Sequence, residues 1–479
     1  MDFLELRRPQ GEERLRTRDL FLAIWMNDLF MKRLVQSIET KTEVMWSLMC
    51  PNQSPGLCEV YGEEFNRLYL QYETQGRYLR QIPIREIWRK VLDSQIESGL
   101  PYIGYKDHVN RKSNQKNLGT IRSSNLCIEI MEYSDQDNYA VCNLASLALP
   151  RFIEGSGRDA HLNYRLLAKV AGVACRNLNR VIDINYYPTE ETRRSNLRTR
   201  PIGIGIQVLA DVFCQLKIPY ESDQAKELNR LMMESIYYGA LEASIELAIR
   251  DGPYEAYEGS PFSQGQFQFD LWNVAPSSLW DWSSLRKRML AHGIRNSLLT
   301  ALMPTASTSQ ILGNTESFEP YTSNLFRRRT LAGDFNVVNR FLIDDLIDLG
   351  LWNERMKKQL IYHRGSIQNI EEIPWDLRQI YKTVWDLPQK CLVDLAVDRA
   401  PFVDQSQSMN IFMATPDYRR ISSSHIYAWR RGLKTGIYYL RSKPASEAIQ
   451  FTLDSSFIQE QREQREQKKD PESCEMCSA

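Results

Sequence analysis

The chain has 479 residues, with 60 Lys plus Arg balanced by 60 Asp plus Glu, and 43% of its residues are hydrophobic. That length corresponds to about three domains, and the composition is that of a folded protein and excludes wholesale disorder. A net charge of zero argues against a protein that binds nucleic acid mainly by charge. The sequence has no run of 18 or more apolar residues, so no membrane span is predicted. Its first residues include Asp2 and Glu5 and no apolar segment, which is not typical of a signal peptide.

The nine cysteines are an odd number and are spread thinly along the chain. This usage is not typical of a disulfide scaffold and favours a reducing compartment with one or two chemically active thiols. We therefore expect a soluble, cytoplasmic protein in which some cysteines take part in redox chemistry.

Helices and short strands alternate along the chain. Apolar spacing predicts a helix over 18–34 and a turn over 51–56. A second helix is predicted from Ser222 or Asp223, either of which can cap it, to Arg250, where a Gly-Pro stop follows. Short apolar runs are predicted to be buried strands at 139–149, 202–209, 298–303, 411–414 and 436–440. Strands that alternate with helices predict an α/β fold.

The C-terminal segment is different in composition. From Gln459 onward it is polar without an apolar face, which predicts a flexible, solvated tail at 458–479 after a folded part at 1–457. The tail ends in Cys474-Glu-Met-Cys477. Two thiolates without a nearby His are too few for a zinc site. The pair is either two incidental surface cysteines or a dithiol that exchanges with a disulfide elsewhere.

A second group of polar residues lies in the middle of the chain, where Asn125, Cys127 and Glu129 alternate with Leu126 and Ile128. In an extended segment the amide, the thiol and the carboxylate would share one face. Such a face could bind a sugar hydroxyl and supply a reactive sulfur and a general base. A buried cysteine on a half-exposed strand explains the pattern equally well, and spacing alone does not decide.

Two motifs bear on nucleotide binding. Residues 304–308 follow an apolar run and predict a turn and then a helix that starts near Ser307. Amides and hydroxyls at a helix start can bind phosphate, although Ser and Thr there are more often only N-caps. The segment 202–208 has two glycines of a dinucleotide fingerprint but not the third, so we expect tight packing there and no Rossmann site.

Two adjacent tyrosines, Tyr438 and Tyr439, lie in the last predicted strand. Side chains of neighbouring strand residues point to opposite faces, where they usually only pack. A stacked pair of tyrosines close to a reactive thiol could instead carry an oxidising equivalent.

These segments, in this order, resemble the large catalytic subunit of class I ribonucleotide reductases of the eukaryotic or eukaryotic-virus type. The resemblance runs from about Arg18 to Cys477. It rests on WSLMCP (46–51), RKSNQKNLGTI (111–121), SNLCIEI (124–130), VCNLASLALP (141–150), RPIGIGIQ (200–207), MPTASTSQILGN (303–314), EPYTSN (319–324), DQSQSMNI (404–411), GLKTGIYYLR (432–441) and CEMC (474–477). It implies part of a ten-stranded α/β barrel with an inward loop that carries a radical cysteine, together with helical additions and a flexible tail.

The resemblance also implies roles for single residues. Cys127 would be the transient thiyl radical that removes the 3′ hydrogen of a ribonucleotide. Glu129 would be the base for the 3′ hydroxyl, and Asn125 would bind the substrate near the sugar. Cys142 matches one of two thiols that reduce the 2′ position and become a disulfide. The substrate-binding residues are then Ser124, Asn125, Pro304, Thr305, Ala306, Ser307 and Thr308, of which the last four match the loop that binds the diphosphate.

The remaining matches concern partners. Tyr438 and Tyr439 match the last steps of a radical path from a metal-containing small subunit, so no metal or other cofactor is expected on this chain. Cys474 and Cys477 match a tail dithiol that reduces the active-site disulfide and is itself reduced by thioredoxin or glutaredoxin. Further expected partners are ribonucleoside diphosphates and either a separate N-terminal half or a second large subunit; neither nucleic acid nor a membrane is expected.

The chain also departs from the family pattern. The family's N-terminal helical domain, the first barrel strands, the other reducing cysteine and the loops of the specificity site have no match here. Ile128 stands where a small polar residue is expected, and we expect it to point away from the site with little effect. The sequence therefore predicts the C-terminal part of a large subunit that reduces ribonucleoside diphosphates to supply DNA precursors. The alternative is a non-catalytic fragment or decoy subunit that binds the small subunit.

Overall fold

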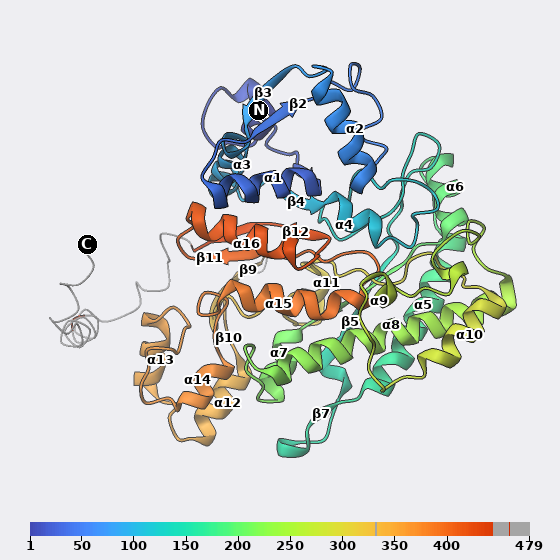
Figure 1. Ribbon diagram of the computed structural model, residues 1–479. Coiled ribbons are helices and arrows are strands. Elements are labelled where there is room, and N and C mark those ends of the chain that lie inside the picture. Colours follow the sequence, from blue (N-terminus) through green and yellow to red (C-terminus); the bar gives the residue numbers. More distant parts are fainter. Residues whose placement is uncertain (331–332, 444–458, 460–479) are drawn as a thin grey trace.

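The computed structural model describes residues 1–330, 333–443 and 459, which form a mixed arrangement of helices and short strands (Figure 1). The α-helices are α1 Asp28–Thr40, α2 Gly62–Thr74, α3 Ile84–Ser98, α4 Lys106–Arg111, α5 Tyr164–Ile184, α6 Glu190–Thr199, α7 Leu209–Gln215, α8 Asp223–Asp251, α9 Gln268–Leu271, α10 Trp282–His292, α11 Thr308–Ile311, α12 Arg340–Asp348, α13 Glu354–Tyr362, α14 Trp375–Ile380, α15 Gln389–Arg399 and α16 Tyr418–Arg430. The strands are β1 Ala23–Met26, β2 Met45–Leu48, β3 Arg80–Pro83, β4 Tyr102–Tyr105, β5 Leu144–Ala148, β6 Ile153–Glu154, β7 His161–Leu162, β8 Gly203–Gln207, β9 Leu325–Thr330, β10 Gly333–Val338, β11 Ile411–Met413, β12 Thr435–Ile437 and β13 Leu440–Ser442. The predicted α/β class is confirmed. The predicted tail, apart from Gln459, lies outside the described residues, as do both of its cysteines.

The strands pair in several small sheets. β1, β4 and β12 form a three-stranded sheet in which β1 and β4 are parallel and β12 is antiparallel to β4. The other parallel pairs are β5 with β8 and β11 with β13. Three antiparallel pairs, β2 with β3, β6 with β7 and β9 with β10, complete the described strands.

The parallel pair of β5 and β8 is extended by two further segments. Ile204 of β8 forms a parallel bridge with Thr300, and Leu302 forms another with Gln407. Four parts of the chain that are far apart in sequence therefore lie side by side. We call the last of them, residues 404–410, the bridging segment.

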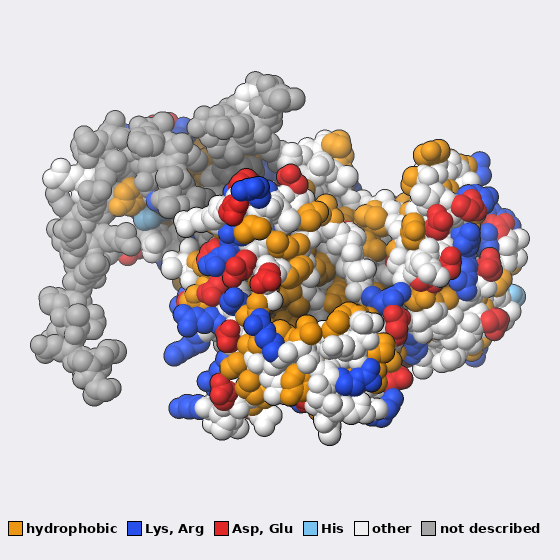
Figure 2. Space-filling view, turned by 90° about the horizontal axis from the view of Figure 1, so that it is seen from above, with side chains coloured by type: hydrophobic (Ala, Val, Ile, Leu, Met, Phe, Trp, Pro, Cys, Tyr) orange, Lys and Arg blue, Asp and Glu red, His pale blue; other side chains and the backbone are white. Residues whose placement is uncertain are grey.

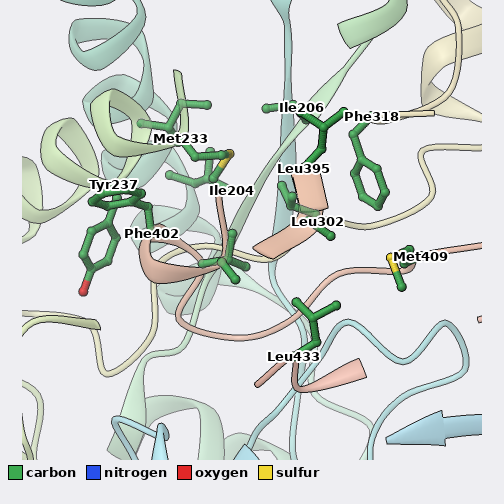
Figure 3. Packing of buried hydrophobic residues seen from close by; sticks show 14 of the residues in the cluster. Ile204, Ile206, Met233, Tyr237, Leu302, Phe318, Leu395, Phe402, Met409 and Leu433 are labelled. Carbon is green, nitrogen blue, oxygen red and sulfur yellow. The ribbon is translucent and has the colours of Figure 1, made fainter. Parts of the chain in front are cut away.

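The main hydrophobic core lies against this parallel array. Ile204 and Ile206 of β8 belong to one buried cluster with Met233 and Tyr237 of α8 and Leu395 of α15 (Figure 3). Helix α8 is the longest described helix and runs close to α5. Helix α16 lies between the N-terminal helices and α15 (Figure 1), which joins the two ends of the described chain in one body.

The sequence prediction is confirmed for the long helix. Helix α8 begins after Ser222, whose hydroxyl accepts the Ala225 N–H at 3.1 Å, and ends before Gly252. The predicted turn at 51–56 is also observed. Both features depend on local signals, an N-cap and a Gly/Pro stop, which act without help from the rest of the fold.

The predicted helix over 18–34 is wrong in its first half. Residues 23–26 form β1, paired in parallel with β4, and α1 begins only after Asn27. The Asn27 side chain accepts the Phe30 N–H at 2.8 Å, which caps the helix at this position. The apolar spacing fitted a helix, but pairing with a strand about 80 residues away decided the conformation of this segment.

The predicted strands are observed in shortened form. The predicted runs at 139–149, 202–209 and 411–414 contain β5, β8 and β11, respectively. The run 298–303 contributes only isolated bridges. The run 436–440 is interrupted, because β12 ends at Ile437 and β13 begins at Leu440.

The expected tight packing of the two glycines in β8 is confirmed. A Cβ on Gly203 would lie 2.6 Å from Leu144 Cδ2, and a Cβ on Gly205 would lie 2.6 Å from the Ala301 carbonyl oxygen. Both distances are shorter than real Cβ contacts. The glycines allow β8 to lie between β5 and the chain around residue 301.

Among the described residues, no helix is long and apolar enough to cross a membrane. Lys and Arg side chains are interspersed with Asp and Glu over the face shown in Figure 2, where hydrophobic side chains gather toward the middle. This pattern agrees with the equal numbers of basic and acidic residues in the chain.

Candidate active site

The segment with the central cysteine, residues 124–130, is a tight turn, and we call it the cysteine loop. The Ile128 N–H donates to the Asn125 carbonyl at 3.2 Å, and Ile128 has a φ of +60°. The predicted extended alternation is therefore wrong. Leu126, grouped with Ile128 by that prediction, is 59% exposed, whereas Ile128 is fully buried.

The left-handed backbone at Ile128 is unusual, because β-branched residues rarely adopt it. Three successive carbonyl groups of the loop are held by hydrogen bonds. The Cys127 carbonyl accepts from Ser408 Oγ at 2.7 Å, the Ile128 carbonyl from Thr435 Oγ1 at 2.9 Å, and the Glu129 carbonyl from the Ser406 N–H at 2.8 Å. The bridging segment and β12 thus fix the backbone of a conformation that costs energy locally.

The Cys127 thiol faces the tyrosine pair. Tyr438 donates a hydrogen bond from its hydroxyl to Cys127 Sγ at 3.5 Å. The rings of Tyr438 and Tyr439 lie 4.4 Å apart between centroids, and Tyr102 of β4 lies 4.8 Å from the first and 5.0 Å from the second. Sulfur and three aromatic rings form a continuous cluster.

The two tyrosines are together because the chain is not a regular strand at this point. The Tyr438 N–H donates to the Met409 carbonyl at 2.7 Å, and the Tyr439 N–H donates to Asn410 Oδ1 at 3.0 Å. Both bonds attach the tyrosines to the bridging segment. Neighbouring residues of a regular strand would point to opposite faces, but the rings of Tyr438 and Tyr439 are in contact, so that expectation is wrong here. Ile128 is fully buried in the hydrophobic cluster against which both tyrosines pack.

Glu129 is buried beside the thiol, with 2% of its surface exposed. Ser408 Oγ lies 3.0 Å from Glu129 Oε2. Burial raises the pKa of the Glu129 carboxyl, and its own backbone N–H, Asn125 and Ser408 oppose that rise by hydrogen bonding. A carboxylate with a raised pKa is a stronger base than one in water, as abstraction of a proton from a hydroxyl requires.

Burial also raises the pKa of Cys127, Tyr438 lowers it through its hydrogen bond, and Glu129 raises it further. The sulfur therefore stays protonated at neutral pH and retains a hydrogen atom. This state differs from that of a nucleophilic cysteine, which is activated as a thiolate.

Cys142 lies two residues before β5 and shares this environment. The next residue, Asn143, anchors the strand by donating to the Pro201 carbonyl at 2.9 Å. Solvent reaches Cys142, yet the surrounding protein desolvates its thiolate and, with Glu132 and Glu129, raises its pKa to about 11. Glu132 is itself buried, which raises its pKa to about 8. Cys142 also interacts electrostatically with Cys127.

The predicted phosphate loop precedes a single helical turn. Thr305 has a φ of +56° and is buried, and its hydroxyl accepts the Ser317 N–H at 2.9 Å. Ala306, Ser307 and Thr308 are exposed. The first amide bonded within the turn is that of Ser309, which donates to the Thr305 carbonyl at 3.0 Å. The amides of residues 306–308 precede it and have no partner within the turn.

Ser124 closes the cysteine loop on the other side. Its hydroxyl donates to the Ile130 carbonyl at 2.7 Å, and the Ile130 N–H donates to Asn125 Oδ1 at 3.2 Å. Of the predicted site residues, Asn125, Cys127 and Glu129 therefore lie in one turn. Tyr438 and Tyr439 lie against that turn. Among the described residues, no group of three or more His, Cys, Asp or Glu is arranged to hold a metal ion.

Residues 1–439 match the family model described as "Ribonucleotide reductase, barrel domain". The chain belongs to the ribonucleotide reductase family. It is 53% identical over 481 residues to the ribonucleoside-diphosphate reductase large subunit of Caenorhabditis elegans, covering 100% of this chain and 60% of that protein. It is 54% identical over 463 residues to the large chain of Schizosaccharomyces pombe, covering 97% and 56%.

A solved structure is also similar. The alpha subunit of the Actinobacillus ureae class Id ribonucleotide reductase matches with a TM-score of 0.59 at 26% identity, covering 77% of this chain and 63% of that one. The chain thus spans a little more than half the length of the curated relatives named above. The parallel array of β5, β8 and the bridging segment lies within the part that matches the reductase barrel domain.

Four residues around the cysteine loop were not predicted from the sequence. Ser408 and Thr435 lie within quoted motifs, but serine and threonine are common, and no local pattern indicated that they hold a loop about 300 residues earlier in the chain. Tyr102 lies in a short strand whose pairing was not predicted. Glu132 follows Glu129 by three residues, and no local pattern in the sequence predicted its interaction with Cys142.

Proposed function

We propose that this chain forms the C-terminal catalytic part of a ribonucleoside-diphosphate reductase, which makes deoxyribonucleoside diphosphates for DNA synthesis by a thiyl-radical mechanism. The observation that carries the proposal is the contact between Tyr438 and Cys127, with an O–S distance of 3.5 Å, in a loop that also presents Glu129. A protonated thiol in contact with an oxidisable phenol is the arrangement that hydrogen-atom transfer needs.

The radical step follows from this contact. Tyr438, once oxidised, takes the hydrogen atom of the Cys127 thiol and becomes a phenol again, while the sulfur becomes a thiyl radical. Tyr439 passes the oxidising equivalent to Tyr438 through rings 4.4 Å apart. A small subunit that carries a metal centre supplies the equivalent from outside this chain.

The substrate step uses the cysteine loop. The Cys127 thiyl removes the 3′ hydrogen of the ribose, and the Glu129 carboxylate accepts the proton of the 3′ hydroxyl. Asn125 binds near the sugar. Cys142 and a second thiol together supply two hydrogens: one protonates the 2′ hydroxyl, which leaves as water, and the other goes to the 2′ carbon, while the two sulfurs form a disulfide. Cys127 then returns the hydrogen to the 3′ carbon and becomes a thiyl radical again, and Glu129 returns its proton to the 3′ oxygen.

The substrate diphosphate binds at the start of α11. Residues Ala306, Ser307 and Thr308 are exposed at the amino end of a helical turn in which their amides have no partner, and this supports the assignment. Pro304 and Thr305 shape the turn, and the Thr305 hydroxyl remains able to donate a proton while it accepts the Ser317 N–H. Ser124 helps to bind the sugar side.

Regeneration needs a reductant that reaches the disulfide. Cys474 and Cys477, which lie outside the described residues, would reduce it by exchange and would in turn be reduced by thioredoxin or glutaredoxin. That exchange requires a reducing compartment, so the proposal includes a cytoplasmic location. A second large subunit or a separate N-terminal half is part of the proposed assembly.

The test is a reductase assay with CDP, the small subunit and dithiothreitol, with and without a supplied N-terminal piece of a relative. We expect little multiple-turnover activity from the chain alone, because Cys142 needs a second thiol, and turnover when the N-terminal piece is added. Turnover must be lost in the Cys127→Ser variant. Absence of turnover with the N-terminal piece, together with tight binding of the small subunit, would favour the decoy-subunit alternative.

A further inference from the structure

The bridging segment contains a hydroxyl that contacts both reactive parts of the cysteine loop. Ser408 is 2% exposed, and its backbone N–H donates to the Leu302 carbonyl at 2.9 Å, which fixes it in the parallel array. Its Oγ lies 2.7 Å from the Cys127 carbonyl oxygen and 3.0 Å from Glu129 Oε2. The mechanism proposed above gives this hydroxyl no role.

The Ser408 hydroxyl has one proton to donate, and two acceptors lie within its reach, the Cys127 carbonyl and the Glu129 carboxyl. When Glu129 is ionised, the Ser408 proton can point to the carboxylate, which is the stronger acceptor because it is charged. When Glu129 is protonated, its own O–H can donate to Ser408 Oγ, and the serine proton is then free to point to the Cys127 carbonyl. The hydrogen bond to the cysteine loop therefore depends on the protonation state of the base.

We propose that Ser408 is a positioning residue that links, through one hydroxyl, the protonation state of Glu129 to the backbone of Cys127. This inference rests on the proposed function for its role in the reaction. The hydroxyl favours the ionised base before the substrate hydroxyl is deprotonated, and it holds the Cys127 carbonyl after Glu129 has taken up the proton.

Of the groups around Glu129, Ser408 is the one best placed to affect the protonation state of the carboxyl. Among the described residues, the titratable groups that interact electrostatically with the carboxyl are the thiols of Cys127 and Cys142, which are neutral at physiological pH because their pKa values are raised. Asn125 and Ser408 are its neutral hydrogen-bond partners, and both favour the ionised form. Asn125 also accepts the Ile130 N–H and so serves the turn itself.

The experiment measures the titration of Glu129 in the full chain by infrared difference spectroscopy of the carboxyl band, which the Glu129→Gln variant assigns. In Ser408→Ala we expect the midpoint to rise by about one pH unit, a ten-fold change in the ionisation equilibrium, which corresponds to the loss of one hydrogen bond to a charged group. Ser408→Cys keeps the volume but donates weakly, so a smaller rise is expected. If Ser408→Ala does not fold, the Glu129 midpoint of Ser408→Cys tests the inference by itself.

Ser406→Ala is the matched control. Ser406 Oγ lies 2.7 Å from Thr435 Oγ1, which holds the Ile128 carbonyl, so this variant loosens the same loop without removing a bond to Glu129. We expect its Glu129 midpoint to be unchanged. An unchanged midpoint in both Ser408 variants, or an equal rise in Ser406→Ala, would overturn the inference.

The readout separates this inference from the proposed function, because the titration needs no turnover. A chain with the expected midpoint shift but no reductase activity in the completed complex would refute the function and leave the coupling standing. An active complex in which the Glu129 midpoint is unchanged by the Ser408 substitutions would support the proposed function and refute the coupling. In an active complex, the acidic limb of the kcat profile of Ser408→Ala should move to higher pH, since Glu129 acts as a base only when ionised.

Discussion

The hydrogen bond between Tyr438 and Cys127 can be tested on this chain without a substrate. Tyr438→Phe removes the hydroxyl 3.5 Å from Cys127 Sγ but keeps the ring, which packs against Tyr439 at 4.4 Å and Tyr102 at 4.8 Å between centroids. The fold should therefore be preserved. The hydroxyl lowers the pKa of Cys127 because it stabilises the thiolate. Its removal raises that pKa and lowers the thiolate fraction at any pH below it.

The size of the effect follows from the strength of one hydrogen bond. Such a bond contributes about 1 kcal/mol, and since 1.4 kcal/mol is a factor of ten in an equilibrium, the thiolate fraction should fall about five-fold. Alkylation by iodoacetamide proceeds through the thiolate. We therefore expect alkylation of Cys127 at pH 8, followed by peptide mass spectrometry, to slow about five-fold in Tyr438→Phe.

Tyr439→Phe is the control, because the structure shows no hydrogen bond from Tyr439 to the thiol. Its alkylation rate at Cys127 should change by less than about two-fold, and Cys391, which lies elsewhere on α15, should react equally in all three proteins. An unchanged rate in Tyr438→Phe, or the same fall in both variants, would refute the hydrogen-bond argument. In a completed complex, by contrast, both variants should lose turnover while substrate binding is retained, because a phenyl ring cannot be oxidised at an accessible potential.

Three further outcomes are expected. Replacing both cysteines of the C-terminal CEMC with serine should leave the completed complex active with dithiothreitol but nearly inactive with thioredoxin; equal activity with both reductants would remove the shuttle role. Gly239→Ala should lower the free energy of unfolding by about 2 kcal/mol or more, because a Cβ there would lie 2.0 Å from the Ala168 carbonyl oxygen, whereas Gly172→Ala, with its nearest contact at 3.2 Å, should cost less in a urea titration. Burial raises the pKa of Glu132 to about 8, so its contribution to stability is present at acidic pH and is lost as pH rises toward and through that value. Between pH 6 and 9, Glu132→Gln should therefore lose less unfolding free energy than the unmodified chain, and parallel losses would contradict the assignment.

Local signals in the sequence determined the features that need no distant partner. Ser222 and Gly252 set the ends of α8, because capping groups satisfy backbone atoms within the same turn. The two glycines of β8 predicted close packing, since a missing Cβ is useful only where another atom takes its place. The combination of motifs indicated the reductase family, and the match over residues 1–439 confirmed it.

The arrangement of the site was decided by tertiary structure. The spacing of Asn125, Cys127 and Glu129 suggested an extended segment, yet the chain forms a turn with Ile128 in the left-handed region. That conformation is unfavourable by itself and persists because Ser408, Thr435 and the Ser406 amide hold three successive carbonyl groups. These partners lie about 280 to 310 residues away in the sequence. Distant hydrogen bonds also decide the backbone at Tyr438 and Tyr439. Their amides donate to the bridging segment, and the chain does not form a regular strand there. Hydrogen bonds between distant segments leave no periodic pattern in the sequence, so only the folded chain shows how the thiol, the base and the tyrosines meet.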